Sequence, residues 1–342
     1  MSDPDISILM CTFNRAAYLR DVLRLLVAQE RTEEFTYEIV VIDNGSSDET
    51  RSVVNTMMDQ TKIPIRYVFS PDGGVHQARN RSLQEGRGHW FAFIDDDELP
   101  EPDWLARLHL AAQQTGANIL GGSVRLQMTD EELASLSREV RRSLRERFEK
   151  TEGGRPMPCG RHTFPGTDNL FIDRQVIDKV GGFDETMIMG GADHDLILRA
   201  REAGFDPWYV PDAVVHHRIP GERVLIAHLY RDAFGSGVVL AFLRQRYHGS
   251  ISVILEAIVR LGHALIVTLP LMGWEFLCRD EMGLLDRRMK WWKMIGYLRF
   301  ASILVLPWAS SYESLFEGLD FRKRRFESLA GSRTRSESGK SS

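Results

Sequence analysis

The nine residues WFAFIDDDE, from Trp90 to Glu98, decide the fold. Their apolar first half, with glycines before it and prolines after the acids, is typical of a buried strand in a parallel sheet. Four acids follow directly, so they lie at the carboxyl end of that strand, where open α/β sheets bind ligands. Carboxylates this close repel one another unless a cation or protons neutralise them, which favours a divalent metal. The alternative is a solvated acidic turn that opens a helix.

Three further strands are expected before this one, each followed by a helix. The strands cover residues 6–11, 37–42 and 65–69, and the helices lie around residues 18–28, 49–58 and 77–81. Apolar residues recur at helical spacing in the first helix, which predicts that it packs on the sheet. Strands that alternate with helices predict an α/β fold with a doubly wound, mostly parallel sheet and helices on both faces.

The composition is that of a globular protein larger than one ordinary domain. The chain has 342 residues, of which 43% are hydrophobic and 27% are charged. Its formal net charge of -5 gives no reason to expect nucleic acid as a partner. The 3 cysteines are too few and too widely spaced for a disulfide framework or a zinc cluster. No basic segment or signal-peptide core opens the sequence, so we expect a cytoplasmic protein.

Polar residues also follow the other predicted strands. Thr12 and Asn14 come after the first strand, Asp43 ends the second, and Arg79 lies on the helix before the acidic strand. Such groups suit a nucleotide, because an acid binds base or ribose donors while a cation and an arginine hold a diphosphate. The glycine motif of dinucleotide sites and the P-loop motif are both absent from the sequence, which disfavours those two classes of site.

Four motifs, in this order and at this spacing, resemble the family 2 glycosyltransferases of the GT-A fold. They are Cys11–Arg15, Asp43–Thr50, Ala78–Asn80 and Asp95–Asp97, and the resemblance extends over about residues 5–220. It implies a Rossmann-like GT-A sheet and a nucleotide-sugar donor whose base lies at Asp43. Asp95 and Asp97 then form an Asp-x-Asp motif near the ribose and the metal, with Mg²⁺ or Mn²⁺ on the diphosphate.

The resemblance also implies which residues contact the donor and the metal. The donor is expected at Thr12, Asn14, Arg15, Asp43, Arg79, Asp95 and Asp96. The metal is expected at Asp97 and at a histidine that the family often places at the end of the strand 208–217. Alternation points His216 and His217 to opposite faces of that strand, so at most one reaches the site. His217 is preferred, and a purely structural histidine is the alternative.

A second acidic stretch, Gly190–Leu196, opens another predicted helix. By itself it is typical of carboxylates that cap a helix. It also resembles the family's Glu-Asp motif, which implies that Asp193 is the catalytic base, although Ala192 replaces the glutamate. Asp195 is expected either to cap the helix or to bind the acceptor. Asn169 lies in a stretch that resembles the family's acceptor-side strand and is expected to contact the acceptor.

Residues 130–150 are rich in arginine and predict a charged helical stretch. One hypothesis is that this stretch is simply a solvated helical face. The other is that it contacts an anionic phospholipid or a polyprenyl diphosphate.

The C-terminal third of the chain is predicted to be helical. We expect a glycosyltransferase domain over 1–220, divided near residue 125 into nucleotide-sugar and acceptor halves, a helical region over 221–320 and a disordered tail over 321–342. Two apolar stretches, 261–274 and 300–312, are each shorter than the about 18 residues of a spanning helix. Flanking tryptophans and basic residues favour helices that lie in a membrane interface. The alternative is a helical subdomain that packs on the core or forms a homodimer.

The predicted function is an inverting, metal-dependent transfer of a sugar to a hydroxyl of a glycan or polyprenyl-linked acceptor, in bacterial polysaccharide synthesis at the inner face of the cell membrane. UDP is preferred because uridine is the family's usual base. Two alternatives remain. A nucleotide-sugar-binding module without catalysis is supported by Ala192, and a nucleotidyltransferase would need a glycine-rich basic loop that residues 11–15 do not supply.

Overall fold

The computed structural model describes residues 3–30, 35–71, 73–147, 154–160, 163–187 and 190–305. The chain divides into two compact units, Met1–Val224 and Leu225–Ser342. Two predictions lie outside the described residues: the disordered tail over 321–342, and the end of the second apolar stretch, 306–312.

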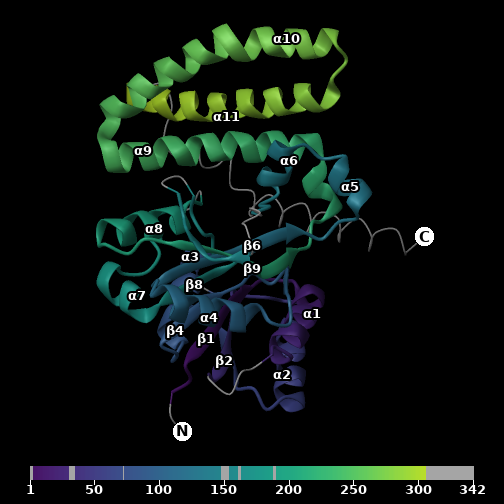
Figure 1. Cartoon of the computed structure of the whole chain (residues 1–342), viewed down its shortest axis with the longest axis vertical. Helices are drawn as coiled ribbons and strands as arrows, with labels where there is room; N and C mark the ends of the chain where they lie inside the picture. Colours follow the sequence, from purple (N-terminus) through teal and green to yellow (C-terminus); the bar gives the residue numbers. More distant parts are fainter. Residues whose placement is uncertain are drawn as a thin grey trace, which may run out of the picture. The chain divides into compact units, whose positions relative to one another are not determined.

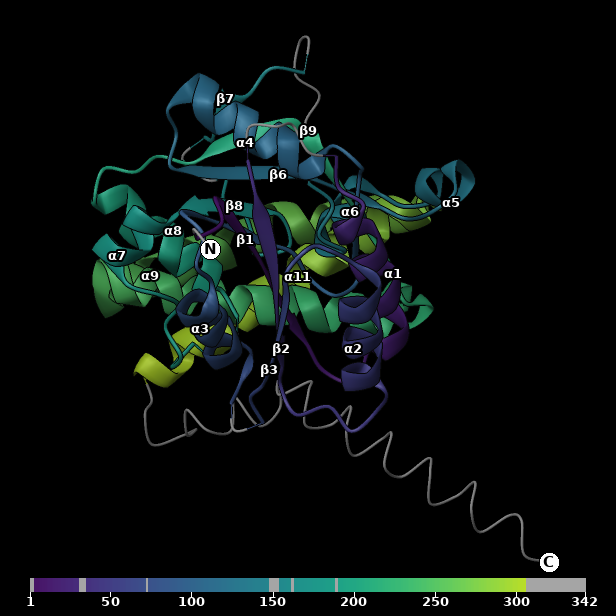
Figure 2. The ribbon, with the colours of Figure 1, turned by 90° about the horizontal axis from the view of Figure 1, so that it is seen from below.

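Four parallel strands form the first half of the sheet in the unit Met1–Val224. They are β1 (Ile6–Thr12), β2 (Tyr37–Asp43), β3 (Ile65–Phe69) and β4 (Trp90–Phe93), paired in the order β3-β2-β1-β4. Every residue of β2 is buried, as expected of a strand covered on both faces. Figure 2 shows α1 (Ala16–Val27) and α2 (Thr50–Gln60) on one side of these strands and α3 (Val75–Glu85) on the other. The predicted doubly wound arrangement is confirmed here.

The second half of the sheet mixes parallel and antiparallel pairs. After β4 come β8 (Leu170–Asp173), β6 (Ile119–Leu126), β9 (Trp208–His217) and β5 (Glu98–Pro100), with β7 (Met157–Pro158) also on β9. The sheet as a whole is mixed rather than mostly parallel, because β8 enters beside β4 from the opposite direction. Helix α4 (Trp104–Thr115) packs on β6 and β9, while α7 (Arg174–Val180) and α8 (Ala192–Glu202) follow β8 in the chain.

The described part of the stretch 130–150 forms two short helices, α5 (Asp130–Ala134) and α6 (Arg138–Ser143). The single continuous stretch that was predicted is interrupted because Ser137 starts α6 afresh, its hydroxyl accepting a hydrogen bond from the backbone N–H of Val140. After α6 the chain forms an antiparallel bridge between Arg147 and Val124 of β6. Residues 148–150 lie outside the described part.

Strand register decides which polar residues meet at the edge of the sheet. Parallel pairing of β1 with β4 aligns Leu9 with Phe93, so the residues that follow both strands extend beyond the same edge. Antiparallel pairing of β5 with β9 places Glu98 directly opposite His217. Residues that are far apart in the sequence therefore become neighbours.

The described part of the second unit consists of long helices (Figure 1). They are α9 (Ile226–His263), the π-helical turn η3 (Ala264–Thr268), α10 (Leu269–Leu277) and α11 (Glu281–Val305), all shown in Figure 1. Gly249 breaks α9 with a φ of 76°, and the helix that starts after it continues through η3 to Leu277. α11 packs along α9, where Gly237 and Gly296 let the two backbones approach closely.

The first predicted apolar stretch, 261–274, belongs to a longer helical run than its length suggested. The run Ile226–Leu277 contains an 18-residue window with a mean hydropathy of 1.8, of which 22% is buried, so by length and composition it is able to cross a membrane. The prediction that this stretch is too short was wrong because Glu256 pairs with Arg260 and Arg244 and the helix continues through both charges. Pro270 follows the wider π-helical turn, where its missing N–H is tolerated.

Candidate active site

Arg15 holds two of the acids that follow β4. Its Nη1 donates to Oδ1 of Asp96 at 2.6 Å and to Oδ2 of Asp97 at 2.7 Å, and the Thr12 hydroxyl donates to Asp96 at 2.7 Å. Burial raises the pKa of Asp96 to about 6, although the charge of Arg15 acts in the opposite direction. Four of the residues expected from the sequence are thus in direct contact.

Asp95 faces two arginines from different elements. Its Oδ1 lies 3.7 Å from Nη2 of Arg79 on α3, and its Oδ2 lies 3.2 Å from Nη1 of Arg145. Burial by itself would raise the pKa of Asp95, but the charges of these arginines outweigh that effect and lower it. Asp95 is therefore ionised at neutral pH.

A second polar cluster lies at the ends of β1 and β2. Asp43 accepts hydrogen bonds from the Tyr67 hydroxyl at 2.6 Å and the Ser46 N–H at 2.8 Å. Asn14, with a φ of 50°, donates its N–H to the Ser46 hydroxyl at 2.9 Å and accepts from the Ser47 N–H at 2.8 Å. An asparagine tolerates this left-handed backbone because its side chain bonds locally. These bonds join two loops and bring Asn14 and Asp43 to the same edge.

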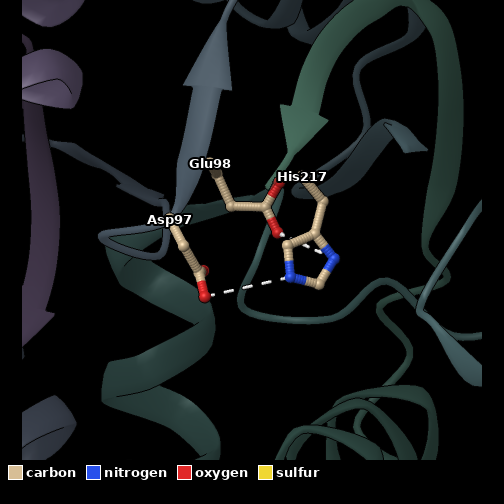
Figure 3. A group of neighbouring side chains, drawn as sticks. All are labelled: Asp97, Glu98 and His217. Atoms are coloured by element: carbon tan, nitrogen blue, oxygen red, sulfur yellow. Dashed lines mark ion pairs between the residues drawn. The ribbon is translucent and has the colours of Figure 1, made fainter. Parts of the chain in front are cut away.

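Glu98 is the last of the four acids after β4, and the sequence pattern assigned it no individual role. It is fully buried, and its Oε1 lies 3.9 Å from Nδ1 of His217, while Oδ2 of Asp97 lies 3.9 Å from Nε2 of the same ring (Figure 3). Among the residues that the structure describes, neither carboxylate oxygen of Glu98 has a hydrogen-bond partner. Burial and the charges of Asp95 and Asp97 raise the pKa of Glu98 well above its usual range.

These three side chains form a group that could hold a divalent metal. One ligand atom from each of Asp97, Glu98 and His217 lies within 4.8 Å of the others. Burial lowers the pKa of His217 to about 4, so its neutral ring offers a lone pair at neutral pH. Nδ1 of the ring lies 3.1 Å from the Leu144 carbonyl, which fixes its orientation. The donor set suits Mg²⁺ or Mn²⁺, and a cation would satisfy the unpartnered Glu98.

The two histidines at the end of β9 point in opposite directions, as strand alternation predicts. His217 is buried against the acids, whereas Nε2 of His216 lies 2.7 Å from a carboxylate oxygen of Glu101 and the ring is partly exposed. His217 alone of the pair is placed to contribute to the acidic group.

Asp193 is the second residue of α8 and is partly buried. Its Oδ1 accepts a hydrogen bond from the His194 N–H at 2.9 Å. Burial by itself would raise the pKa of Asp193, but the hydrogen bonding and charge of His194 and the charge of Arg79 lower it. Asp193 is thus an ionised carboxylate able to accept a proton, and it shares Arg79 with Asp95.

Asn169 does not serve the role expected of it. The residue is fully buried, its Nδ2 donates to the carbonyls of Ser123 and Ala213 at 2.9 Å each, and its Oδ1 accepts from Trp104 Nε1 at 2.9 Å. These bonds satisfy backbone carbonyls of β6 and β9 next to the shift in strand register between Gly122 and Ser123. The amide is occupied by the sheet, so we correct the acceptor-side prediction for Asn169.

Asp195 is also turned inward rather than toward an acceptor. It is fully buried and accepts a hydrogen bond from Arg199 Nε at 2.8 Å, one turn along α8. Arg199 in turn donates to the carbonyls of Val180 and Gly182. Asp195 therefore orders the turn after α7, and the acceptor-binding alternative for it is corrected as well.

Two arginines of the stretch 130–150 reach the acids, and the sequence did not distinguish them from their neighbours. Arg145 contacts Asp95, and Arg147 forms an ion pair with the buried Asp168. Arg138 and Arg142 are exposed, and Arg145 reaches Asp95 although about half of its own side chain, 49%, is exposed. The long-range bridge from Arg147 to Val124 makes this difference, and no local pattern reports it.

The chain matches the model of the family described as "Glycosyl transferase family 2" over residues 7–181. Succinoglycan biosynthesis protein ExoM of Rhizobium meliloti is 30% identical over 251 residues, which cover 71% of this chain and 77% of that protein. Glycosyltransferase AglE of Haloferax volcanii is 27% identical over 218 residues, covering 63% of this chain and 67% of that protein.

Two solved structures share the fold. The mannosyltransferase PcManGT from Pyrobaculum calidifontis, in complex with GDP-Man and Mn²⁺, is 18% identical, covers 91% of this chain and 89% of that chain, and has a TM-score of 0.57. TarS 1-349 of S. aureus, in complex with UDP-GlcNAc, is 12% identical, covers 89% and 92%, and has a TM-score of 0.51. Both likenesses concern the GT-A fold. With the family model and ExoM, they establish that this chain is an enzyme of the GT-A fold and belongs to the family 2 glycosyl transferases.

Proposed function

We propose that the protein is an inverting glycosyltransferase that moves a sugar from a nucleotide-sugar donor to a hydroxyl of a glycan or lipid-linked acceptor. One observation carries the proposal: Asp193 and Asp95, on different elements, are both ionised, and the charge of Arg79, whose guanidinium lies 3.7 Å from Asp95, acts on both carboxylates. A base and an acidic donor site therefore share one charged environment. The biosynthetic context, polysaccharide assembly, is supported by the printed function of ExoM.

Asp193 is proposed as the base of a single displacement. Its carboxylate accepts the proton of the acceptor hydroxyl as that oxygen attacks the anomeric carbon from the face opposite the leaving group. One displacement inverts the anomeric centre, so a single base is sufficient. His194 and Arg79 keep Asp193 ionised and orient it before the acceptor arrives.

Asp97, Glu98 and His217 are proposed as the metal ligands, with Mg²⁺ or Mn²⁺ as the ion. When bound, such an ion supplies positive charge for the diphosphate leaving group. Arg15 holds Asp97 from the other side and thereby fixes the position of that carboxylate. The fit rests on the buried, unpartnered Glu98.

The cluster of Asn14, Asp43 and Tyr67 is proposed as the site of the base and ribose. The carboxyl group of Asp43 offers acceptor oxygens to the N–H groups of a base, and the Tyr67 and Ser46 bonds hold it in place. We propose UDP as the nucleotide. The two solved structures of similar fold hold GDP-Man and UDP-GlcNAc, so the test compares both nucleotides.

The experiment measures binding and transfer with the full-length protein. Thermal shift with UDP and with GDP, each with and without Mn²⁺, should show stabilisation by one nucleotide that depends on the metal. Asp97→Asn should weaken that nucleotide's binding and abolish transfer, because it removes a metal ligand. Exposed Arg142→Ala is the matched control and should bind as the unmodified chain does. Nucleotide binding of unchanged affinity and metal dependence in Asp97→Asn would sink the metal assignment.

Membrane association is proposed for the second unit on the basis of an exposed apolar face. Along the helix after Gly249, apolar side chains at least 60% exposed recur on one face: Ile251, Leu255, Ile258, Val259, Ile266, Trp274, Phe276 and Leu277. On the same helix, the charged Glu256 pairs instead with Arg260 and with Arg244. An apolar face in solvent and a charged face turned inward are the reverse of a water-soluble helix. We therefore propose that this face meets lipid at the inner side of the cell membrane.

A further inference from the structure

The segment that follows α6 points two guanidinium groups into the acidic site. Nη1 of Arg145 lies 3.2 Å from Oδ2 of Asp95, and Arg147 forms an ion pair with Asp168. The charge of Arg145 also interacts with Asp97, Glu98 and Asp193, which places it among the acids of both the donor and the acceptor side. The charge of Arg147 interacts with Asp193 as well. A solvated helical face would leave both groups in water.

The backbone of this segment is fixed from three sides. Arg147 exchanges both backbone hydrogen bonds with Val124 of β6, at 2.8 and 2.9 Å. Leu144 is buried and its carbonyl lies 3.1 Å from Nδ1 of His217. Glu146 accepts two bonds of 2.7 Å from the Arg141 guanidinium. The fold therefore fixes the backbone from which the two arginine side chains extend toward Asp95 and Asp168.

Arg145 adopts a backbone conformation that its residue type disfavours. Its φ is 72°, in the left-handed region that an arginine rarely occupies. Such strain persists where the surrounding structure imposes it, and it concentrates at ligand sites. Here the strained residue is the one whose side chain reaches the centre of the acids, and half of that side chain remains exposed to a ligand.

We propose that Arg145 and Arg147 form a clamp that binds a diphosphate. The inference rests on the proposed function, because it assigns a ligand class to the same site. A guanidinium carries five N–H donors in a planar fork, more than one carboxylate uses, and the fork matches phosphate oxygens in pairs. Asp95 and Asp168 orient the two forks. The diphosphate is that of the donor nucleotide or that of a lipid-linked acceptor, and both offer the same chemistry.

The test uses full-length variants that remove the charge without disturbing the fold. Arg145→Gly removes the side chain and suits the left-handed backbone, and Arg145→Lys keeps the charge but loses the fork. For the second arginine, the double variant Arg147→Gln with Asp168→Asn leaves no unpaired buried charge. Arg142→Ala, on the preceding helix α6 and exposed, is the control. Circular dichroism checks that each variant is folded.

Two binding measurements distinguish the sources of the diphosphate. The first compares the Kd of UDP with that of uridine, in Mn²⁺. The second measures farnesyl diphosphate in the presence of saturating UDP and Mn²⁺. If the clamp holds the donor, Arg145→Gly should weaken the binding of UDP by about tenfold or more, since a charge-assisted hydrogen bond to the diphosphate is lost. The affinity for uridine, which has no diphosphate, should stay unchanged. For a clamp on the acceptor, UDP binding should persist while farnesyl diphosphate binding falls by a similar factor.

The proposal is overturned if Arg145→Gly and the double variant bind both diphosphates as well as Arg142→Ala does. It is overturned equally if the unmodified chain binds neither diphosphate. If the unmodified chain binds farnesyl diphosphate but no nucleotide, the proposed nucleotide-sugar donor is wrong while the arginine clamp stands. Failure of the proposed function and failure of the clamp therefore give different results.

Discussion

Asp193 is held as an ionised carboxylate by neighbours that also serve the donor side of the site. The His194 N–H donates to it, and the charge of Arg79, whose guanidinium lies 3.7 Å from Asp95, also acts on it. A lowered pKa leaves Asp193 unprotonated at neutral pH but makes it a weak base, so it can take the proton only as the attack of the oxygen makes the acceptor hydroxyl strongly acidic. The role that we propose for Asp193 rests on this arrangement rather than on its position in the helix that carries it.

Asp193→Asn should reduce turnover by about 10²- to 10⁴-fold, because the amide keeps the shape of the side chain but cannot take up a proton. Donor binding should survive, since the base does not hold the nucleotide. The measurement is initial transfer rate together with the Kd of UDP in Mn²⁺. Near-normal turnover would move the role to another acid.

Glu98→Gln should affect stability in opposite directions with and without metal. In metal-free protein the raised pKa of Glu98 means that the folded state favours the protonated form. The stability that this acid contributes is therefore fully present below its unfolded pKa and is lost as the pH rises. Glutamine has no such loss, so its advantage in melting temperature over the unmodified chain should grow from pH 4 to pH 8. With saturating Mn²⁺ the unmodified chain should have the higher melting temperature, because it keeps the Glu98 ligand. If Mn²⁺ raises the melting temperature of Glu98→Gln as much as that of the unmodified chain, Glu98 is not a ligand.

At the scale of the element, α9 and α11 depend on two glycines that other helices would not require. A Cβ at Gly237 would lie 1.9 Å from the Lys293 carbonyl oxygen, and one at Gly296 would lie 2.1 Å from that of Phe234. Gly262, in the later part of α9, has no atom within 4 Å of such a Cβ. Glycine is therefore required at Gly237 and Gly296 by the close approach of the backbones, whereas at Gly262 it only lowers helix propensity.

Gly296→Ala should destabilise the helical unit by about 1–3 kcal/mol, because the backbones must separate to admit the methyl group. Gly262→Ala should stabilise it by about 0.5–1 kcal/mol through helix propensity alone. Thermal unfolding followed by circular dichroism, in the same detergent for both variants, makes the comparison. Equal effects of the two substitutions would contradict the close crossing.

At the scale of the whole molecule, the apolar face of the second unit predicts attachment to a lipid surface. The triple variant Ile258→Gln, Ile266→Gln and Phe276→Ser should weaken binding to anionic vesicles by about 10³-fold, at about 1.5 kcal/mol or more for each side chain withdrawn from lipid. A control with Met58→Gln and Leu110→Gln changes exposed apolar residues of the first unit and should sediment normally.

High salt should release only part of the unmodified chain from the vesicles, since it screens charge and leaves apolar contacts intact. Full-length protein that stays in the supernatant at low salt would show that the face serves another purpose, such as a homodimer. That result would also favour a soluble acceptor.

The sequence by itself determined the elements of the first unit and the class of enzyme. Continuous apolar runs and helical periodicity depend only on neighbouring residues, so β1 to β4 and the helices after them could be predicted. The four motifs carried the family in the same way, because each is local. Asp43, Asp95 and Asp97 were expected at one edge because parallel strands end together.

Only the tertiary structure decided which polar residues face the site and which make their hydrogen bonds within the fold. Asn169 and Asp195 looked functional, yet the sheet and Arg199 occupy them. Arg145 looked like the other arginines of its stretch, and Glu98 was given no role apart from the other acids, yet the bridge of Arg147 to β6 brings Arg145 to Asp95 and the pairing of β5 with β9 places Glu98 beside His217. Such contacts join residues tens of positions apart, and hydrogen-bond saturation depends on all of a residue's neighbours. The length of the helix after Gly249 was also decided this way, because Glu256 pairs with both Arg244 and Arg260 and the helix continues through these charges.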